Sequence, residues 1–148
     1  MPDNVFIDSN IWLYAFVASD TEKHKIAAGL ITSANQQIVI STQVLNEVSV
    51  NLLRKANVDE AFIRDFIKDA YSKYRIADIG SATCVSASLL RETASLSYWD
   101  SLIVASSLEN GCGTLYTEDL QHGQIVENKL LIVNPFLKTK KNKHPKTH

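Results

Sequence analysis

The 148-residue chain is poor in cysteine, glycine and long apolar runs, and each shortage excludes a class of protein. Two cysteines, Cys84 and Cys112, are too few for a disulfide framework, and their small or apolar neighbours predict reduced, packed thiols. The five glycines form neither a Gly-x-Gly-x-x-Gly dinucleotide motif nor a P-loop. The longest apolar run, residues 11–18, is much shorter than the ~18 residues of a membrane span. No basic region precedes an apolar one at the N-terminus, so we expect a cytoplasmic protein without a signal peptide or membrane segment.

Charge is balanced over the whole chain but unevenly distributed along it. Lys and Arg number 15 against 16 Asp and Glu, and 45% of the residues are hydrophobic, which excludes disorder for most of the chain. Residues 138–148 hold five lysines and no acid, and the remainder carries a net charge of −6. The length predicts one domain over residues 1–137. The basic tail at 138–148 is either an arm that binds nucleic acid or a frayed, solubilising end.

Short apolar segments alternate with helical patterns along the chain. Buried strands are predicted at 5–7, 38–40, 114–116 and 130–133, with a weaker candidate at 76–79. Helices are predicted at 22–33, 43–55, 60–74, 82–93 and 98–109, two of them capped by Asp59 and Ser81. Strands separated by helices predict an α/β domain with a parallel sheet.

Acidic residues directly follow two of the predicted strands. Asp8 follows the first strand, and Glu118 and Asp119 follow the strand at 114–116. Ligands of parallel α/β sheets bind at the carboxyl ends of the strands, so these acids are site candidates. Each also has an ordinary interpretation, because Asp8 or Ser9 is able to cap the next helix and Asp119 is able to lie in a turn.

Asp100 is the one charged residue in an apolar helical stretch. The apolar residues of 98–108 cover nearly the whole helix circumference, so this helix is predicted to be buried on all sides. A lone buried carboxylate costs several kcal/mol unless a partner compensates it. That partner is either the Ser97 backbone amide, in a capping box, or a metal ion.

Glu47 has the weakest individual signal. Its helix buries the face of Leu45, Val48 and Leu52, and Glu47 lies on the opposite, polar face. The periodicity therefore predicts a solvated surface residue, unless that polar face lines a cleft.

Taken together, four segments resemble the PIN-domain ribonuclease family, and in particular its VapC-type toxins of toxin–antitoxin pairs. The segments are Val-Phe-Ile-Asp-Ser-Asn at 5–10, Val-Leu-Asn-Glu at 44–47, Tyr-Trp-Asp-Ser-Leu-Ile-Val-Ala-Ser at 98–106 and Leu-Tyr-Thr-Glu-Asp-Leu-Gln-His-Gly at 115–123. Their order and spacing extend from about residue 4 to residue 136. Ser9 departs slightly from the pattern, because many relatives have Thr there, but the hydroxyl is kept.

The resemblance implies a three-layer α/β/α domain with a central parallel sheet, and an acidic quartet that meets in one pocket. The matching positions are Asp8, Glu47, Asp100 and Asp119. Ser9 and Thr117 match hydroxyl positions that help to hold metal and water, and Asn10 is a supporting polar residue or a helix cap. Glu118 is the alternative to Asp119 as the fourth carboxylate, although the pattern favours Asp119.

The chemistry of such a quartet agrees with the family's activity. Oxygen ligands without His or Cys suit Mg²⁺ or Mn²⁺, and clustered carboxylates are expected to have raised, coupled pKa values when no cation is bound. Divalent ions support in-line hydrolysis of RNA, and the resemblance implies products with a 5′ phosphate and a 3′ hydroxyl. It also implies an antitoxin protein and a homodimer as partners. Basic residues available to meet RNA are Lys23, Lys25, Arg54, Lys55, Arg75 and the lysine tail.

Three other functions remain as alternatives. A PIN-like module that binds RNA or a partner without cleavage would usually have lost one of the acids, and here all four are present. A phosphoryl-signalling receiver would need an acidic pair after the first strand and a lysine after the last one, and both are missing. A non-toxin PIN enzyme of RNA maturation stays open. The RNA target, the number of metal ions and the identity of the antitoxin are beyond the sequence.

Overall fold

The computed structural model describes residues 3–33 and 35–137. The predicted basic tail at 138–148 therefore lies outside the described residues. Within the described ranges, no helix is both long and apolar enough to cross a membrane. The cytoplasmic location stays a prediction.

A six-stranded sheet forms the centre of the domain, in the strand order β3-β2-β1-β4-β6-β5. Its strands are β1 (Asp3–Ile7), β2 (Gln36–Ser41), β3 (Arg75–Ala77), β4 (Thr114–Tyr116), β5 (Ile125–Val126) and β6 (Leu130–Val133). β1 to β4 and β6 pair in parallel, as predicted, whereas β5 pairs antiparallel with β6. The sheet is thus mixed but mostly parallel.

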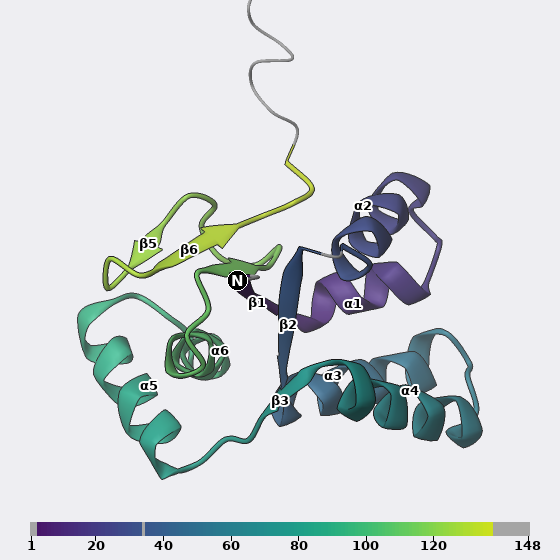
Figure 1. Cartoon of the computed structure of the whole chain (residues 1–148), viewed down its shortest axis with the longest axis horizontal. Coiled ribbons are helices and arrows are strands. Elements are labelled where there is room, and N and C mark those ends of the chain that lie inside the picture. Colours follow the sequence, from purple (N-terminus) through teal and green to yellow (C-terminus); the bar gives the residue numbers. More distant parts are fainter. Residues whose placement is uncertain (1–2, 34, 138–148) are drawn as a thin grey trace, which may run out of the picture.

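Six helices cover the two faces of the sheet. They are α1 (Ser9–Phe16), α2 (Thr21–Ile31), α3 (Thr42–Lys55), α4 (Glu60–Lys73), α5 (Ser81–Thr93) and α6 (Tyr98–Glu109). α1 packs against α2 and α3, and α3 packs against α4, while α5 packs on α6. Figure 1 shows α1 to α4 on one side of the sheet and α5 with α6 on the other. The predicted three-layer α/β/α architecture is confirmed.

Side-chain caps begin most of the helices where the sequence places Ser or Asp. Asp59 accepts a hydrogen bond from the Phe62 amide at 2.9 Å, which confirms it as the cap of α4. Ser41 ends β2 and caps α3 through the Val44 amide at 3.2 Å. The prediction for Ser81 was wrong by one residue, because Gly80 occupies the cap position and Thr83 bonds back to its amide.

The interior of α6 is buried on all sides, as its apolar pattern predicts. Residues 101–107 are all buried. Ser101 and Ser107 donate their hydroxyl groups to the Tyr98 and Ile103 carbonyls, whereas the buried Ser106 hydroxyl has no hydrogen-bond partner among the described residues. The first turn differs from the prediction, because Tyr98 and Trp99 are exposed and Asp100 is partly exposed. This turn is the N-terminal end of α6 and lies outside the core. Asp100 is therefore not a fully buried carboxylate.

Two short elements were not predicted. α1 is only eight residues long and is apolar on most of its surface, so it has no helical period to recognise. β5 has two residues and reaches β6 through a tight turn in which Glu127 and Asn128 take positive φ angles. Cys84 also differs from its prediction because it is exposed, whereas burial raises the pKa of the Cys112 thiol to about 12.

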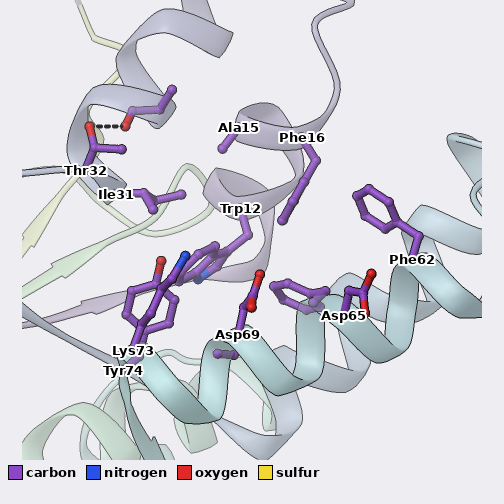
Figure 2. Close-up of a pocket in the computed structure, with 13 residues that line it drawn as sticks. Trp12, Ala15, Phe16, Ile31, Thr32, Phe62, Asp65, Asp69, Lys73 and Tyr74 are labelled. Atoms are coloured by element: carbon purple, nitrogen blue, oxygen red, sulfur yellow. Dashed lines mark hydrogen bonds between the residues drawn. The ribbon is translucent and has the colours of Figure 1, made fainter.

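An apolar groove of about 460 Å³ opens between α1, α2 and α4 (Figure 2). Its floor is the buried ring of Trp12, which makes edge contacts to Phe66 and Tyr74. Phe16 and Phe62 stand at its edge and are each 40% exposed. The domain therefore leaves an aromatic surface uncovered on the face of α4.

Candidate active site

The site lies where the strand order of the sheet reverses. From β1 the chain continues to β2 on one side, whereas β4 occupies the other side of β1. Open α/β sheets bind their ligands in the crevice outside the carboxyl ends of the strands at this switch point. Ile7 and Tyr116 are paired at the ends of β1 and β4, so Asp8 and Thr117 leave the sheet side by side.

Asp8 is the most deeply placed acid, with a relative exposure of 4%. Its Oδ1 accepts a hydrogen bond from the Ser9 amide at 2.7 Å, so it also caps α1, in agreement with the ordinary interpretation. Its Oδ2 accepts from the Thr117 hydroxyl at 2.9 Å. Burial raises the pKa of Asp8 to about 6 against the lowering effect of these two bonds, and the charges of Glu47 and Asp119 raise it further.

Thr117 and Asn10 hold the segment that follows β4. The Thr117 hydroxyl donates to Asp8 and accepts from the Asp119 amide at 3.1 Å, so one buried oxygen ties the two acidic positions together. The Asn10 side chain donates to Asp119 Oδ2 at 3.1 Å and accepts from the Glu118 amide at 3.3 Å. Asn10 thus supports Asp119 as well as belonging to the first turn of α1.

Glu118 and Asp119 point to different neighbours. The Glu118 carboxylate forms an ion pair with Lys23 and accepts from the Tyr14 hydroxyl at 3.1 Å. Asp119, in contrast, is held by Asn10 and contributes to the repulsion at Asp8. This geometry favours Asp119 as the fourth acid. It also removes Lys23 from the free cations expected to meet RNA.

Glu47 reaches the site from α3. It is half-buried and lines a cleft of about 480 Å³ with Trp99 and Leu102 of α6, which is the condition under which its polar face matters. Its Oε2 accepts from Gln43 Nε2 at 3.2 Å. The negative charge of Glu47 raises the pKa of Asp8, so the two carboxylates face the same region.

Asp100 lies in the first turn of α6. Its amide donates to the Ser97 hydroxyl at 3.1 Å, which is half of the predicted capping box. The other half is missing, because the Asp100 carboxylate has no hydrogen-bond or ion-pair partner within residues 3–33 and 35–137. The helix N-terminus therefore accounts for the Asp100 backbone and leaves its carboxylate available.

The donor set fits a hard divalent cation in its chemistry. All four acids offer oxygen ligands, and the charges of Glu47 and Asp119 both disfavour the ionised form of Asp8. In the described part of the chain, no three His, Cys, Asp or Glu side chains lie close enough together to hold an ion in this structure.

Fold and site together define an α/β domain with carboxylates at the switch point of its sheet. A family model of the PIN domain matches residues 5–127, and the chain belongs to the PIN domain family. No curated protein sequence matches the chain.

Several solved structures share this fold. A toxin–antitoxin complex from Klebsiella pneumoniae is 19% identical with a TM-score of 0.66, and the alignment covers 89% of this chain and 98% of that chain. VapC20 of Mycobacterium tuberculosis, a toxin that cleaves the sarcin-ricin loop, is 22% identical with a TM-score of 0.63, over 78% and 91%. VapBC2 of Rickettsia felis, bound to a promoter DNA fragment, is 18% identical with a TM-score of 0.62, over 87% and 96%. At these identities the likeness concerns the fold.

Residues that were not among the predicted site positions also line this region. Gln43 and Trp99 line the cleft beside Glu47, and Tyr14 with Lys23 holds Glu118. The sequence offered little to find them, since polar residues on an exposed helix face and a Trp in an apolar helix are ordinary features. Their proximity is a product of the tertiary structure.

Proposed function

We propose that this protein is a metal-dependent endoribonuclease and the toxin of a type II toxin–antitoxin pair. The observation that carries the proposal is the buried Asp8, joined through the Thr117 hydroxyl to the Asp119 segment at the switch point of a PIN domain. Asp8, Glu47, Asp100 and Asp119 would hold Mg²⁺ or Mn²⁺, with Ser9, Asn10, Thr117 and Glu118 supporting them. When bound, the ion supplies Lewis-acid stabilisation of the charge that develops on the phosphate oxygens.

The protein's own residues provide orientation and a proton acceptor. The Ser9 amide donates a hydrogen bond to Asp8 Oδ1 and the Thr117 hydroxyl donates one to Asp8 Oδ2. Together these two bonds fix the plane of the carboxylate. Asn10 fixes Asp119 in the same way. Gln43 occupies Oε2 of Glu47, so Oε1 is the atom that is left to accept a hydrogen bond or a proton from an attacking water.

A cleavage assay tests the proposal. Wild type with Mn²⁺ or Mg²⁺ is expected to cut a mixed RNA pool and leave 5′ phosphates, and EDTA should abolish the activity. Asp8→Asn should lower the rate by at least about 100-fold, the scale of losing a positioned catalytic group, while the protein stays folded. The exposed Glu92→Gln on α5 is the matched control and should cut at the wild-type rate.

Three outcomes would contradict the proposal in different ways. Full activity in EDTA would exclude the metal mechanism. Wild-type activity of Asp8→Asn would exclude the site. RNA binding without any cleavage in Mn²⁺ or Mg²⁺ would favour the alternative, a PIN-like binding module.

We further propose an antitoxin protein as the partner of this chain. Two kinds of support are the toxin–antitoxin complexes among the structural neighbours and the uncovered apolar groove of Figure 2. A small open reading frame immediately upstream should encode the antitoxin, and co-expression should relieve growth arrest by this chain. Cleavage without growth arrest would favour a non-toxin PIN enzyme of RNA maturation. The homodimer stays a prediction, which the mass of the purified protein in solution tests.

A further inference from the structure

The cleft beside Glu47 has a composition that catalysis by the four acids does not explain. It lies between the N-terminal turns of α3 and α6, and its volume of about 480 Å³ is in the range of small-molecule sites. Gln43, Asn46 and Glu47 provide its polar side, and Ile79, Trp99 and Leu102 provide its apolar side. A flat ligand with apolar faces and a polar edge would satisfy both sides.

Trp99 forms an exposed aromatic wall of this cleft. It is 61% exposed, although the following residues of α6 are buried in the core. Its ring packs edge-on against Tyr98 at 5.2 Å, and the Arg91 guanidinium lies over the Tyr98 ring at 4.3 Å. Arg91 is itself fixed by a 2.7 Å bond to the Ser101 hydroxyl. Trp99 therefore belongs to a supported aromatic platform, and its own exposed face is free to stack.

Gln43 orients Glu47 on the polar side of the same cleft. Its Nε2 donates to Glu47 Oε2, and its Oε1 is buried without a hydrogen-bond partner among the described residues. The amide is held in this orientation because a carboxylate only accepts, so rotating the amide would set two oxygens against each other. The neighbouring Asn46 lines the cleft and is exposed, so its side-chain amide is the polar group that the edge of a ligand can reach.

We propose that this cleft binds an unpaired nucleobase of the RNA substrate, stacked on Trp99 and hydrogen-bonded along its polar edge to the side-chain amide of Asn46. Single-stranded bases are recognised by stacking on aromatic rings and by bonds to their edges. Glu47 lines the cleft and belongs to the acidic site, so the bound base lies next to the scissile phosphate. The inference rests on the proposed ribonuclease function and identifies its substrate as single-stranded at this position.

Intrinsic fluorescence provides a direct measurement of binding. The chain has two tryptophans, and Trp12 is buried at 2% exposure, so quenching from outside reports on Trp99. The probes are a short mixed-sequence single-stranded RNA and an abasic ribose-phosphate oligomer of equal length, both in EDTA so that nothing is cut. The RNA should quench Trp99 and protect it from acrylamide, and the abasic oligomer should not.

Substitutions in the cleft test which residues contact the RNA. The affinity of each variant is measured with a labelled RNA, so the measurement does not depend on tryptophan fluorescence. Trp99→Leu should weaken binding by about 5- to 150-fold, the range of one base–aromatic stack, and Trp99→Phe should retain most of the affinity. Asn46→Leu should weaken binding by about 5-fold, the loss of one hydrogen bond. Tyr71→Ala on α4 is the matched control, because Tyr71 is 55% exposed and does not line the cleft, and it should bind as wild type.

The outcomes separate this inference from the ribonuclease proposal. Unchanged RNA affinity of Trp99→Leu, or equal binding of RNA and the abasic oligomer, overturns the nucleobase cleft even if Asp8→Asn abolishes cleavage. A change of oligomeric mass in Trp99→Leu with unchanged RNA affinity also overturns it and assigns the platform to a protein interface. Trp99-dependent binding without cleavage in Mn²⁺ or Mg²⁺ upholds the cleft and refutes the ribonuclease.

Discussion

Asp8 combines a structural and a chemical role at the end of β1. It caps α1 through the Ser9 amide, yet its burial beside Glu47 and Asp119 makes its ionised form costly. A pKa of about 6 against the ordinary 3.8 corresponds to about 3 kcal/mol of unfavourable free energy when the group is ionised. The native state therefore binds more protons than the unfolded chain between about pH 4 and 6.

This difference in proton binding predicts how Asp8→Asn changes the free energy of unfolding. In EDTA at pH 7 the variant should be more stable than wild type, by up to about 3 kcal/mol, because the buried charge is gone. The advantage should shrink as the pH falls through 6 and vanish below about 4, where wild-type Asp8 is protonated. Thermal melts from pH 4 to 8 measure it. A constant difference across that range would show that the substitution acts through packing instead of charge.

Thr117 provides a second prediction at this scale. Thr117→Val removes the hydroxyl that bridges Asp8 Oδ2 and the Asp119 amide, so both lose a partner and stability should fall by about 1–3 kcal/mol. In wild type the Thr117 hydrogen bond lowers the pKa of Asp8, so its removal should move the acidic limb of a cleavage pH profile to higher pH. Thr117→Ser keeps the hydroxyl and should restore both the stability and the pH profile. A valine variant with an unchanged pH profile would exclude the bridge.

At the scale of elements, the start of α6 contains a capping serine, Ser97, and an acid, Asp100, that we propose as a metal ligand. The Ser97 hydroxyl caps the helix through the Asp100 amide, whereas the Asp100 carboxylate is not used by the cap. Core packing holds the rest of α6, so the first turn is able to present Tyr98, Trp99 and Asp100 outside the core.

Two variants distinguish these roles. Ser97→Ala should cost about 1 kcal/mol and keep the metal-induced stabilisation. Asp100→Asn should cost at most about 1 kcal/mol in EDTA, from a weaker interaction with the helix dipole, and should lose most of the metal effect. For wild type, Mn²⁺ at 100 times its dissociation constant should add about 2.7 kcal/mol. Thermal melts of each variant with EDTA and with Mn²⁺ distinguish the capping role from the metal-binding role. A full Mn²⁺ shift of the melting temperature in Asp100→Asn would show that Asp100 is not a metal ligand.

At the scale of the whole molecule, charge is separated along the chain. Residues 1–137 carry a net charge of −6 and hold the acidic site, and the five lysines follow at 138–148. An acidic body repels RNA, so we propose that the lysine segment supplies a sequence-independent phosphate contact to the nuclease domain.

Deletion of residues 138–148 tests this role of the lysines. RNA binding should weaken, and the slope of log affinity against log salt concentration should become shallower by about 0.7 for each phosphate that the protein no longer neutralises. The cleavage position should not change, because contacts to phosphates carry no sequence information. Replacement of the five lysines by glutamine is the matched control for length. An unchanged slope in both variants would assign the segment a solubilising role only.

Much of the domain follows from local sequence patterns. The apolar strands, the cap at Asp59 and the all-round burial of residues 101–107 each arise from interactions within a few residues, so periodicity and residue type predict them. Asp8 and Asp119 could be nominated for the same reason, because strand ends converge at one edge of any parallel sheet. The antiparallel β5 could not, because a two-residue strand leaves no period.

Only the tertiary structure decided which polar residues lie together in the candidate site. Whether Glu47 is solvent-exposed or lines a cleft depends on the first turns of α3 and α6 lining the same cleft, although these two segments are about fifty residues apart in the sequence. The choice of Asp119 over Glu118 depends on Asn10 and Lys23, which reach the turn from α1 and α2. Trp99 and Gln43 form one cleft for the same reason. Sequence alone determined the elements and their acids because those depend on neighbours along the chain, whereas the site depends on neighbours in space.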